Sequence, residues 1–241
     1  MKSTILVVGL GEVGNPLYEI IKEHHEAIGV DIDPVELHGE CEVMHICYPY
    51  GVHDFFGQSV AYIEKYKPHL TIINSTVAPG TTRTIYSKTG ASVVFSPIRG
   101  KHFKMKQDML HYAKFIGGVD EESSQKAAEH FQSIGMKTRI LSSPEAAELA
   151  KLTETTYFGI IIAWAQEVER YCDQFGVNYD QLVSFYDEIA FFPPVKYTPG
   201  VIGGHCVMAN IKILKTVFQS DILDAIENSN QLKIQRKETD S

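Results

Sequence analysis

The fold is indicated by residues 4–14, which read Thr-Ile-Leu-Val-Val-Gly-Leu-Gly-Glu-Val-Gly. The apolar, β-branched run at 4–9 predicts a buried parallel strand, and a helical pattern follows at 16–23. The glycines between them have the spacing of a dinucleotide-binding turn. The first permits the turn, the second lets the backbone approach a pyrophosphate, and the third lets helix and strand pack closely. The residues expected to bind a dinucleotide are Gly9, Gly11, Glu12, Val13 and Gly14.

The next predicted strand ends at Asp31, 20 residues after Gly11. A carboxylate at this point accepts hydrogen bonds from ribose hydroxyls and repels the 2′-phosphate of NADP, so NAD is the expected cofactor. For the glycines alone, a tight turn without a ligand is the alternative. The strand before them, the helix after them and Asp31 together favour a cofactor site.

Strands and helices alternate over residues 1–142. The predicted strands cover 4–9, 27–31, 43–47, 70–74, 92–95, 114–116 and 137–141. The predicted helices include 16–23, 62–67 and 121–133. This alternation predicts an α/β domain with a doubly wound parallel sheet of the Rossmann type.

From Pro144 onward the pattern is helical. It continues over 144–175, and the middle, 158–165, is apolar almost all round. The surface that this helix would expose on a monomer predicts a homodimer formed through 144–175. Further helices are predicted at 180–192 and 206–219. The expected domains are therefore an NAD-binding Rossmann domain at 1–142, a smaller all-helical domain with a long central helix at 143–225, and a disordered tail at 226–241.

The composition excludes several classes of protein. Lys and Arg number 22 against 30 Asp and Glu, a net charge of −8, so we expect no nucleic-acid partner. The longest apolar run, 157–165, is too short to span a membrane. The four cysteines and ten histidines form no metal-ligand spacing, so no metal site is expected. Scattered cysteines and an N-terminus that is not a signal peptide predict a cytoplasmic protein.

Ser75 and Thr76 follow the strand predicted at 70–74. Open α/β sheets bind ligands at the carboxyl ends of their strands, so both residues are expected at the cofactor. The alternative is an ordinary strand-to-helix turn, with Thr81 as the helix cap.

Glu148, Lys151 and Thr155 share one face of the long helix because they are spaced by three and four residues. A lysine in a closed site can hold a substrate oxygen as that oxygen gains negative charge. The alternative is a solvated ion pair between Glu148 and Lys151.

A glycine-rich loop at 199–206 ends in Gly203-Gly204-His205-Cys206. The glycines let a flat substrate lie close to the backbone, and His205 either orients the substrate or caps the next helix. Cys206 falls at the start of that helix, where the helix dipole favours the reactive thiolate. The alternative is a small buried hydrophobe, which is how we interpret Cys41, Cys47 and Cys172.

Together these motifs resemble the UDP-glucose/GDP-mannose dehydrogenase family. The matching stretches are 9–14, 75–82, Ser96-Pro97, 148–157 and 199–206. The Gly-Gly-His-Cys form is most similar to the UDP-N-acetylmannosamine dehydrogenase branch. The resemblance implies NAD-dependent oxidation of a sugar or nucleotide-sugar primary alcohol to a carboxylate, in two hydride transfers.

The resemblance also implies roles for single residues. Cys206 corresponds to the nucleophile that captures an aldehyde as a thiohemiacetal, which is oxidised to a thioester and hydrolysed. Lys151 corresponds to the lysine that holds the oxyanion, and Thr76 to a threonine near the nicotinamide. The helix at 144–175 corresponds to the dimerisation helix of the family.

Three positions depart from the family pattern: Ile98 stands for Glu, Thr155 for Asn and Asn210 for Asp. Neither Ile98 nor Asn210 can act as a base, so thioester hydrolysis is the step most affected. Family members also continue into a second α/β domain that binds the nucleotide, whereas this sequence ends at Ser241. Three explanations stay open: a separate chain supplies that domain, the substrate is smaller, or catalysis has been lost.

Three functions follow. The first is a sugar dehydrogenase that acts through Cys206, which the presence of Cys206 and Lys151 favours. The second is a two-electron hydroxy-acid dehydrogenase, which needs a helix-borne lysine but no cysteine. The third is a catalytically weakened NAD-binding subunit or sensor, which the three departures favour.

Overall fold

The computed structural model describes residues 3–31, 35–37, 39–100, 102–188, 197–203 and 206–239. The chain divides into two compact units, which we call the sheet unit (Met1–Lys151) and the helical unit (Leu152–Ser241). The division falls within one long helix, whose residues 144–151 group with the sheet. None of the helices in the described ranges is long and apolar enough to cross a membrane.

The sheet unit is built on the sheet that the alternating sequence predicts, with seven strands in the described ranges. They are β1 (Ser3–Val8), β2 (Ala27–Val30), β3 (Glu40–Ile46), β4 (Leu70–Ile73), β5 (Val93–Phe95), β6 (Lys114–Gly118) and β7 (Thr138–Ile140). Their order across the sheet is β2-β1-β3-β4-β5-β6-β7. Because β2 and β3 lie on opposite sides of β1, the winding changes direction between β1 and β3.

The strand pairs are parallel, as predicted for a doubly wound sheet, except β5 and β6, which are antiparallel. The connection between them holds a 3₁₀ helix, η1 (His102–Lys104), and the short helix α4 (Met105–His111). It returns the chain to the end of the sheet that it left, since Lys114 at the start of β6 contacts Ser96 and Pro97 after β5. A parallel strand would require a crossover to the opposite end.

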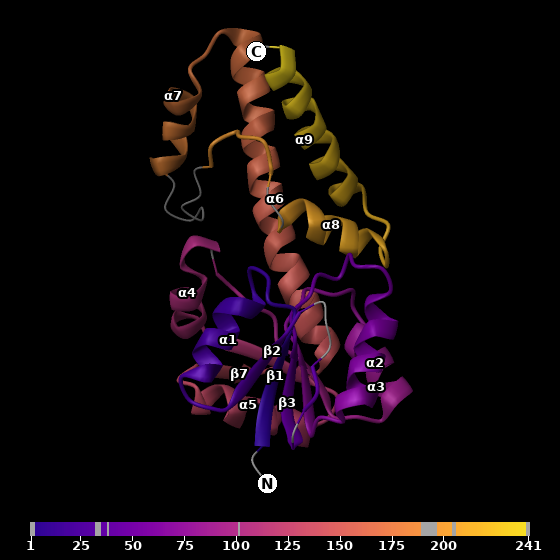
Figure 1. Cartoon of the computed structure of the whole chain (residues 1–241). Coiled ribbons are helices and arrows are strands. Elements are labelled where there is room, and N and C mark those ends of the chain that lie inside the picture. Colours follow the sequence, from indigo (N-terminus) through magenta and orange to yellow (C-terminus); the bar gives the residue numbers. More distant parts are fainter. Residues whose placement is uncertain are drawn as a thin grey trace. The chain divides into compact units, whose positions relative to one another are not determined.

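Helices cover both faces of the sheet (Figure 1). Besides α4, they are α1 (Gly14–Lys22), α2 (Phe55–Tyr66), α3 (Thr81–Thr89) and α5 (Glu121–Ser133). Ile5 and Val7 of β1 pack in the hydrophobic cluster that includes residues of α1, α4 and α5. Leu6 and Val8 pack in the cluster that includes residues of α2 and α3. The apolar run of β1 is therefore buried on both faces, as expected for a doubly wound sheet.

The helical unit follows, and its central helix confirms the predicted bounds. Its elements are α6 (Pro144–Phe175), α7 (Tyr179–Val183), the 3₁₀ helix η2 (Ser184–Glu188), α8 (Val207–Lys215) and α9 (Asp221–Thr239). The Ser143 hydroxyl accepts a hydrogen bond from the Ala146 N–H at the start of α6. Helix α8 packs closely on α6 at Gly159, where a Cβ would lie 2.8 Å from Val207 Cγ1.

Two predicted helices are wrong in extent. The helix predicted at 180–192 ends as an α-helix at Val183, and residues 189–192 lie outside the described ranges. The Ser184 hydroxyl donates to the Gln181 carbonyl, and the chain tightens there into η2. The helix predicted at 206–219 ends at Lys215, where the backbone N–H groups of Thr216 and Val217 bond to carbonyls three residues earlier and so tighten the last turn.

The prediction of a disordered tail at 226–241 is wrong through Thr239, since α9 extends to that residue. Leu223 and Ile226 pack in the hydrophobic cluster with residues of α8. Ser229 and Asn230 are buried and hydrogen-bonded. Burial of polar side chains hides this helix from a hydrophobic pattern, which is why the sequence reads as a tail.

Candidate functional site

The glycine turn after β1 needs its glycines for different reasons. Gly9 has φ +89°, and a Cβ there would lie 2.6 Å from the Tyr48 backbone N. A Cβ on Gly14 would lie 1.7 Å from the Gly9 carbonyl oxygen, so α1 packs directly on the turn. Gly11 is exposed, and a Cβ there would meet no atom within 4 Å. The space beside Gly11 is thus open to a ligand.

Two further features fit a dinucleotide at this turn. Helix α1 begins after Val13 without a side-chain cap, and the positive end of a helix attracts phosphate. Asp31 is exposed after β2, and its Oδ1 lies 3.5 Å from the Leu10 backbone N. The carboxylate therefore stands beside the glycine turn, where a ribose would lie. Glu12 is exposed on the same turn.

Ser75 and Thr76 follow β4 at the carboxyl end of the sheet. The Ser75 hydroxyl is buried and donates to the Tyr48 carbonyl at 2.6 Å, so it joins the ends of β4 and β3. Thr76 is only half-buried. Sequence reasoning missed Tyr48, since an aromatic residue after a strand carries no distinct signal.

Glu148 belongs to α6, and its fully buried side chain reaches the first residues of helix α3. Its carboxylate accepts hydrogen bonds from the backbone N–H groups of Gly80 and Thr82 and from the Thr82 hydroxyl, at 2.7, 3.0 and 2.7 Å. Burial raises the pKa of Glu148, against the effect of these hydrogen bonds. The alternative of a solvated ion pair with Lys151 is therefore wrong. Thr81 is also not the cap, because its hydroxyl donates to the Ala78 carbonyl.

Lys151 is half-buried one helical turn after Glu148. Its positive charge lowers the pKa of Lys114, a buried residue at the start of β6. Sequence reasoning missed Lys114, because a lysine that begins a short apolar strand normally points to solvent. Lys114 thus places an amine at the ends of β4 and β5, where it contacts Asn74 and Ser96.

Thr155 and Asn210 are partners within the helical unit. The Asn210 side-chain amide donates to the Thr155 hydroxyl at 2.9 Å, and that hydroxyl donates to the Leu152 carbonyl at 3.0 Å. The two departures from the family pattern therefore form one hydrogen-bonded pair without a carboxylate. Ile98, the third departure, is buried in the hydrophobic cluster with α1, α4 and α5.

Cys206 is exposed immediately before α8, whereas Cys41, Cys47 and Cys172 are buried. Burial raises the pKa of the Cys41 and Cys47 thiols to about 12 each. The interpretation of these three as core residues is confirmed, and the buried alternative for Cys206 is wrong. Gly203 is exposed, while Gly204 and His205 lie outside the described residues.

The loop before Cys206 is held by two buried amides. Asn230 of α9 accepts from the Ile202 N–H at 2.7 Å and donates to the Ile202 carbonyl at 3.1 Å. Gln166 of α6 donates to the Gly200 carbonyl at 2.7 Å. Sequence reasoning missed Asn230 because it expected a disordered tail there.

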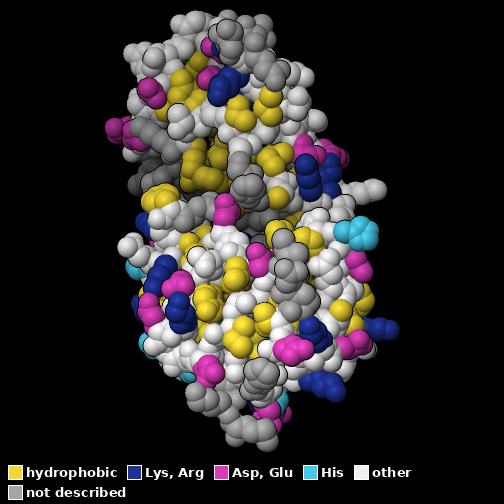
Figure 2. All heavy atoms as spheres, viewed as in Figure 1, with side chains coloured by type: hydrophobic (Ala, Val, Ile, Leu, Met, Phe, Trp, Pro, Cys, Tyr) yellow, Lys and Arg dark blue, Asp and Glu magenta, His cyan; other side chains and the backbone are white. Residues whose placement is uncertain are grey.

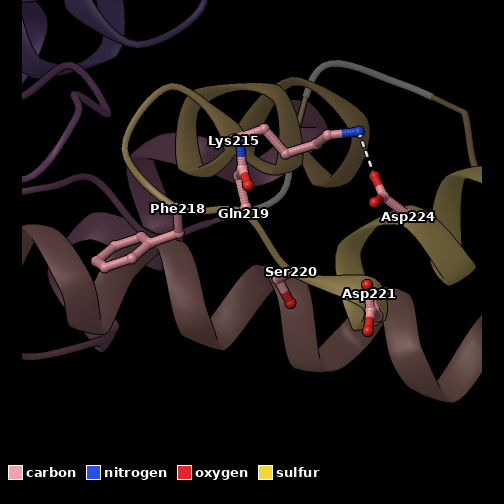
Figure 3. Close-up of a pocket in the computed structure, with 6 residues that line it drawn as sticks. All are labelled: Lys215, Phe218, Gln219, Ser220, Asp221 and Asp224. Atoms are coloured by element: carbon pink, nitrogen blue, oxygen red, sulfur yellow. Dashed lines mark hydrogen bonds and ion pairs between the residues drawn. The ribbon is translucent and has the colours of Figure 1, made fainter.

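A separate pocket of about 510 Å³ lies where α8 meets α9 (Figure 3). It is lined by Lys215, Phe218, Gln219, Ser220, Asp221 and Asp224. Lys215 Nζ lies 2.6 Å from Asp224, so the charges of this pocket pair with each other. It contains none of the predicted site residues. In the described ranges, no three side chains of His, Cys, Asp or Glu form a metal site.

The doubly wound sheet with its glycine turn is a Rossmann-type fold. Residues 145–232 match the model of the UDP-glucose/GDP-mannose dehydrogenase family, central domain. This stretch of the chain is thus similar to the central domain of that family.

Two relatives carry the name UDP-N-acetyl-D-mannosamine dehydrogenase. The protein of Methanocaldococcus jannaschii is 32% identical over 154 residues, which cover 60% of this chain and 36% of that protein. The protein of Methanococcus vannielii is 26% identical over 254 residues, which cover 84% and 59%. The chain thus matches less than two thirds of the length of either relative.

Two solved structures share the fold. UDP-D-ManNAc dehydrogenase from Pyrococcus horikoshii has a TM-score of 0.81 at 22% identity, covering 95% of this chain and 68% of that one. The 3-hydroxyisobutyrate dehydrogenase of Mycobacterium tuberculosis has a TM-score of 0.72 at 14% identity, covering 98% and 93%.

Proposed function

We propose that this protein is an NAD-dependent dehydrogenase that oxidises the primary alcohol of a sugar or nucleotide sugar through a thioester on Cys206. The observation that carries the proposal is the exposed thiol of Cys206 before α8, beside three buried cysteines. The match of residues 145–232 to the family's central domain, and the relatives named for a nucleotide-sugar substrate, support it.

The proposal gives each residue a chemical task. NAD, when bound, accepts hydride from the substrate carbon. Gly9, Gly11, Gly14 and Asp31 hold it, on the geometry of the turn described above. Lys151 stabilises the substrate oxygen as it becomes negative. The Cys206 thiolate would then attack the aldehyde carbon, and the resulting thiohemiacetal would become a thioester when a second NAD in the same site takes a second hydride.

Release of the acid from the thioester is the step at which this chain departs from the family pattern. Water must attack the thioester to free the acid and the thiol, and general-base help is typically worth about 10²–10⁴-fold in rate. The Thr155–Asn210 pair offers a hydroxyl and an amide, and Ile98 offers neither acid nor base. We therefore propose that hydrolysis limits turnover.

NADH production across a panel of nucleotide sugars and free sugar alcohols tests the proposal. A productive substrate identifies the alcohol, and Cys206→Ser separates the reaction from simple alcohol oxidation. Formation of NADH that survives Cys206→Ser unchanged contradicts the thioester route.

A two-electron hydroxy-acid dehydrogenase is the second candidate. One observation favours it: the structure of 3-hydroxyisobutyrate dehydrogenase is matched over 93% of its own length. Such an enzyme requires Lys151 but not Cys206, so Cys206→Ser distinguishes the two candidates. NAD binding without NADH formation from any substrate favours the third candidate, an NAD-binding subunit or sensor.

We also propose a homodimer formed through α6. Several large apolar side chains are exposed on α6, namely Tyr157, Phe158, Ile160, Trp164, Tyr171 and Phe175. Hydrophobic side chains reach the surface at several places in Figure 2, where charges of both signs are spread between them. A large exposed apolar face is typical of a protein interface.

We also propose a cytoplasmic location, with which the free cysteines among the described residues agree.

A further inference from the structure

Lys114 is buried at the start of β6, with 3% of its surface exposed. Its Nζ donates to Asn74 Oδ1 at 3.3 Å, to the Ser96 carbonyl at 2.8 Å and to the Pro97 carbonyl at 3.0 Å. Three acceptors match the three N–H groups of an ammonium. The ring of Phe131 lies 4.8 Å from Nζ, and among the described residues no salt bridge joins Lys114 to a carboxylate. The geometry thus favours a buried positive charge without a counterion.

A directed chain of hydrogen bonds extends from this amine into the sheet. Because Asn74 Oδ1 accepts from Lys114, the Asn74 amide nitrogen faces His45 Nδ1 at 3.0 Å and donates to it. His45 then carries its proton on Nε2, which donates to His130 Nε2 at 2.9 Å. Both imidazoles are therefore neutral in this arrangement.

The titratable groups that interact with Lys114 are His45 of β3, Cys47 directly after β3, and Lys151 of α6. His130 of α5 contacts His45 rather than Lys114. Burial is the main cause that lowers the pKa of Lys114 to about 7; Cys47 raises this pKa and the charge of Lys151 lowers it. Burial also lowers the pKa of His45 and of His130, the latter to about 4, and raises that of Cys47 to about 12. Lys114 is thus the buried group of this cluster that changes charge near neutral pH.

The amine lies at the end of the sheet where the second half of a dinucleotide binds. The glycine turn and Asp31 follow β1 and β2, which assigns the adenosine half to that side of the switch point. The nicotinamide half then falls to the strand ends beyond it. Asn74 directly follows β4, and Ser96 directly follows β5. The charge of Lys114 is therefore held beneath the nicotinamide half.

We propose that Lys114 is a positioning residue that sets the preference of this site between NAD⁺ and NADH. Its ammonium opposes the cationic nicotinamide of NAD⁺ and tolerates the neutral ring of NADH. The inference rests on the proposed NAD site, and it does not depend on which alcohol is oxidised. By linkage, binding of NAD⁺ expels a proton from Lys114, and deprotonation of Lys114 strengthens NAD⁺ binding.

Calorimetric titration of the full chain with NAD⁺ and with NADH, at about pH 6 and about pH 8.5, tests this. The ratio of the NADH affinity to the NAD⁺ affinity is expected to fall about tenfold as pH rises. A tenfold change corresponds to a shift of one unit in the pKa of Lys114 when NAD⁺ binds. NAD⁺ binding near pH 7, measured in two buffers of different ionisation enthalpy, is expected to release a fraction of a proton. This second measurement uses the unmodified chain.

Lys114→Met is expected to remove the pH dependence of the affinity ratio and to leave NAD⁺ favoured at both pH values. Lys114→Arg stays charged, so it is expected to remove the pH dependence and to leave NADH favoured. The matched control is Lys88→Met at the exposed end of α3, which is expected to behave as the unmodified chain. An equal pH dependence in the unmodified chain and in Lys114→Met overturns the inference, as does NAD⁺ binding without proton release. Absence of binding for both cofactor forms at either pH overturns the proposed NAD site, and this inference with it.

Discussion

Glu148 Oε1 accepts two hydrogen bonds from Thr82, one from its backbone N–H at 3.0 Å and one from its hydroxyl at 2.7 Å. The carboxylate thereby caps α3 from the first turns of α6, with no exposure to solvent. This contact connects the loop after β4 to the turn of α6 that carries Lys151. The sequence suggests that Glu148 forms a surface ion pair, whereas its buried carboxylate connects α6 to α3 beside the candidate site.

Glu148→Gln is expected to lower the free energy of unfolding by about 1–3 kcal/mol, because an amide nitrogen would then face buried N–H donors. Urea unfolding measures the loss. The matched control is Glu145→Gln, which removes a partly exposed pair with Arg83 that is worth about 0–1 kcal/mol. Equal losses in the two variants would contradict the buried cap.

Asn230→Ala is expected to lower the free energy of unfolding by about 1–3 kcal/mol, since it leaves the Ile202 N–H and carbonyl without partners. Asn228→Ala, an exposed position on the same helix, is the control and is expected to change little. If both substitutions are silent, the loop is not held by α9.

Stability is expected to fall as pH drops from about 6.5 toward 4. In the folded chain the pKa of His45 lies well below 6.5 and that of His130 is about 4. The unfolded chain therefore binds more protons in this window, which favours unfolding as pH falls. His130→Gln is expected to reduce the loss between pH 6.5 and 4 by on the order of 2 kcal/mol. A pH profile unchanged by the substitution would show that His130 does not remain neutral.

NAD is expected to bind more tightly than NADP by about tenfold or more, because Asp31 repels a 2′-phosphate. Asp31→Asn should narrow the difference, whereas Glu36→Gln, an exposed carboxylate nearby in sequence, should leave it. Calorimetric titration with both cofactors checks this. Equal affinities in the unmodified chain would remove Asp31 from the ribose site.

The parts of the fold that follow local rules are predicted from the sequence. The bounds of α6 follow from Ser143-Pro144 and from Gly176, whose φ of +65° suits a helix stop. The reversal of β6 is not predicted, because strand direction depends on which end of the sheet a connection reaches.

Some residues of the candidate site are likewise predicted from the sequence, and others are not. The glycine turn and Cys206 are found by spacing, because their chemistry depends on neighbours in the chain. The burial of Lys114 and of Asn230 depends on acceptors brought from distant segments, at Ser96 and at Ile202. A local sequence pattern does not show hydrogen-bond partners from distant segments. Polar residues such as Lys114 and Asn230 are therefore predicted to lie on the surface.

The central claim is that substrate carbon becomes attached to Cys206 and leaves slowly. Intact-mass spectrometry after incubation with NAD and a productive sugar substrate, alongside NADH absorbance, measures it directly. We expect a burst of NADH, then a slow steady rate, with an adduct that Cys206→Ser abolishes. Steady turnover to the carboxylate without any adduct would contradict the claim, because it would require another group of the chain to activate water.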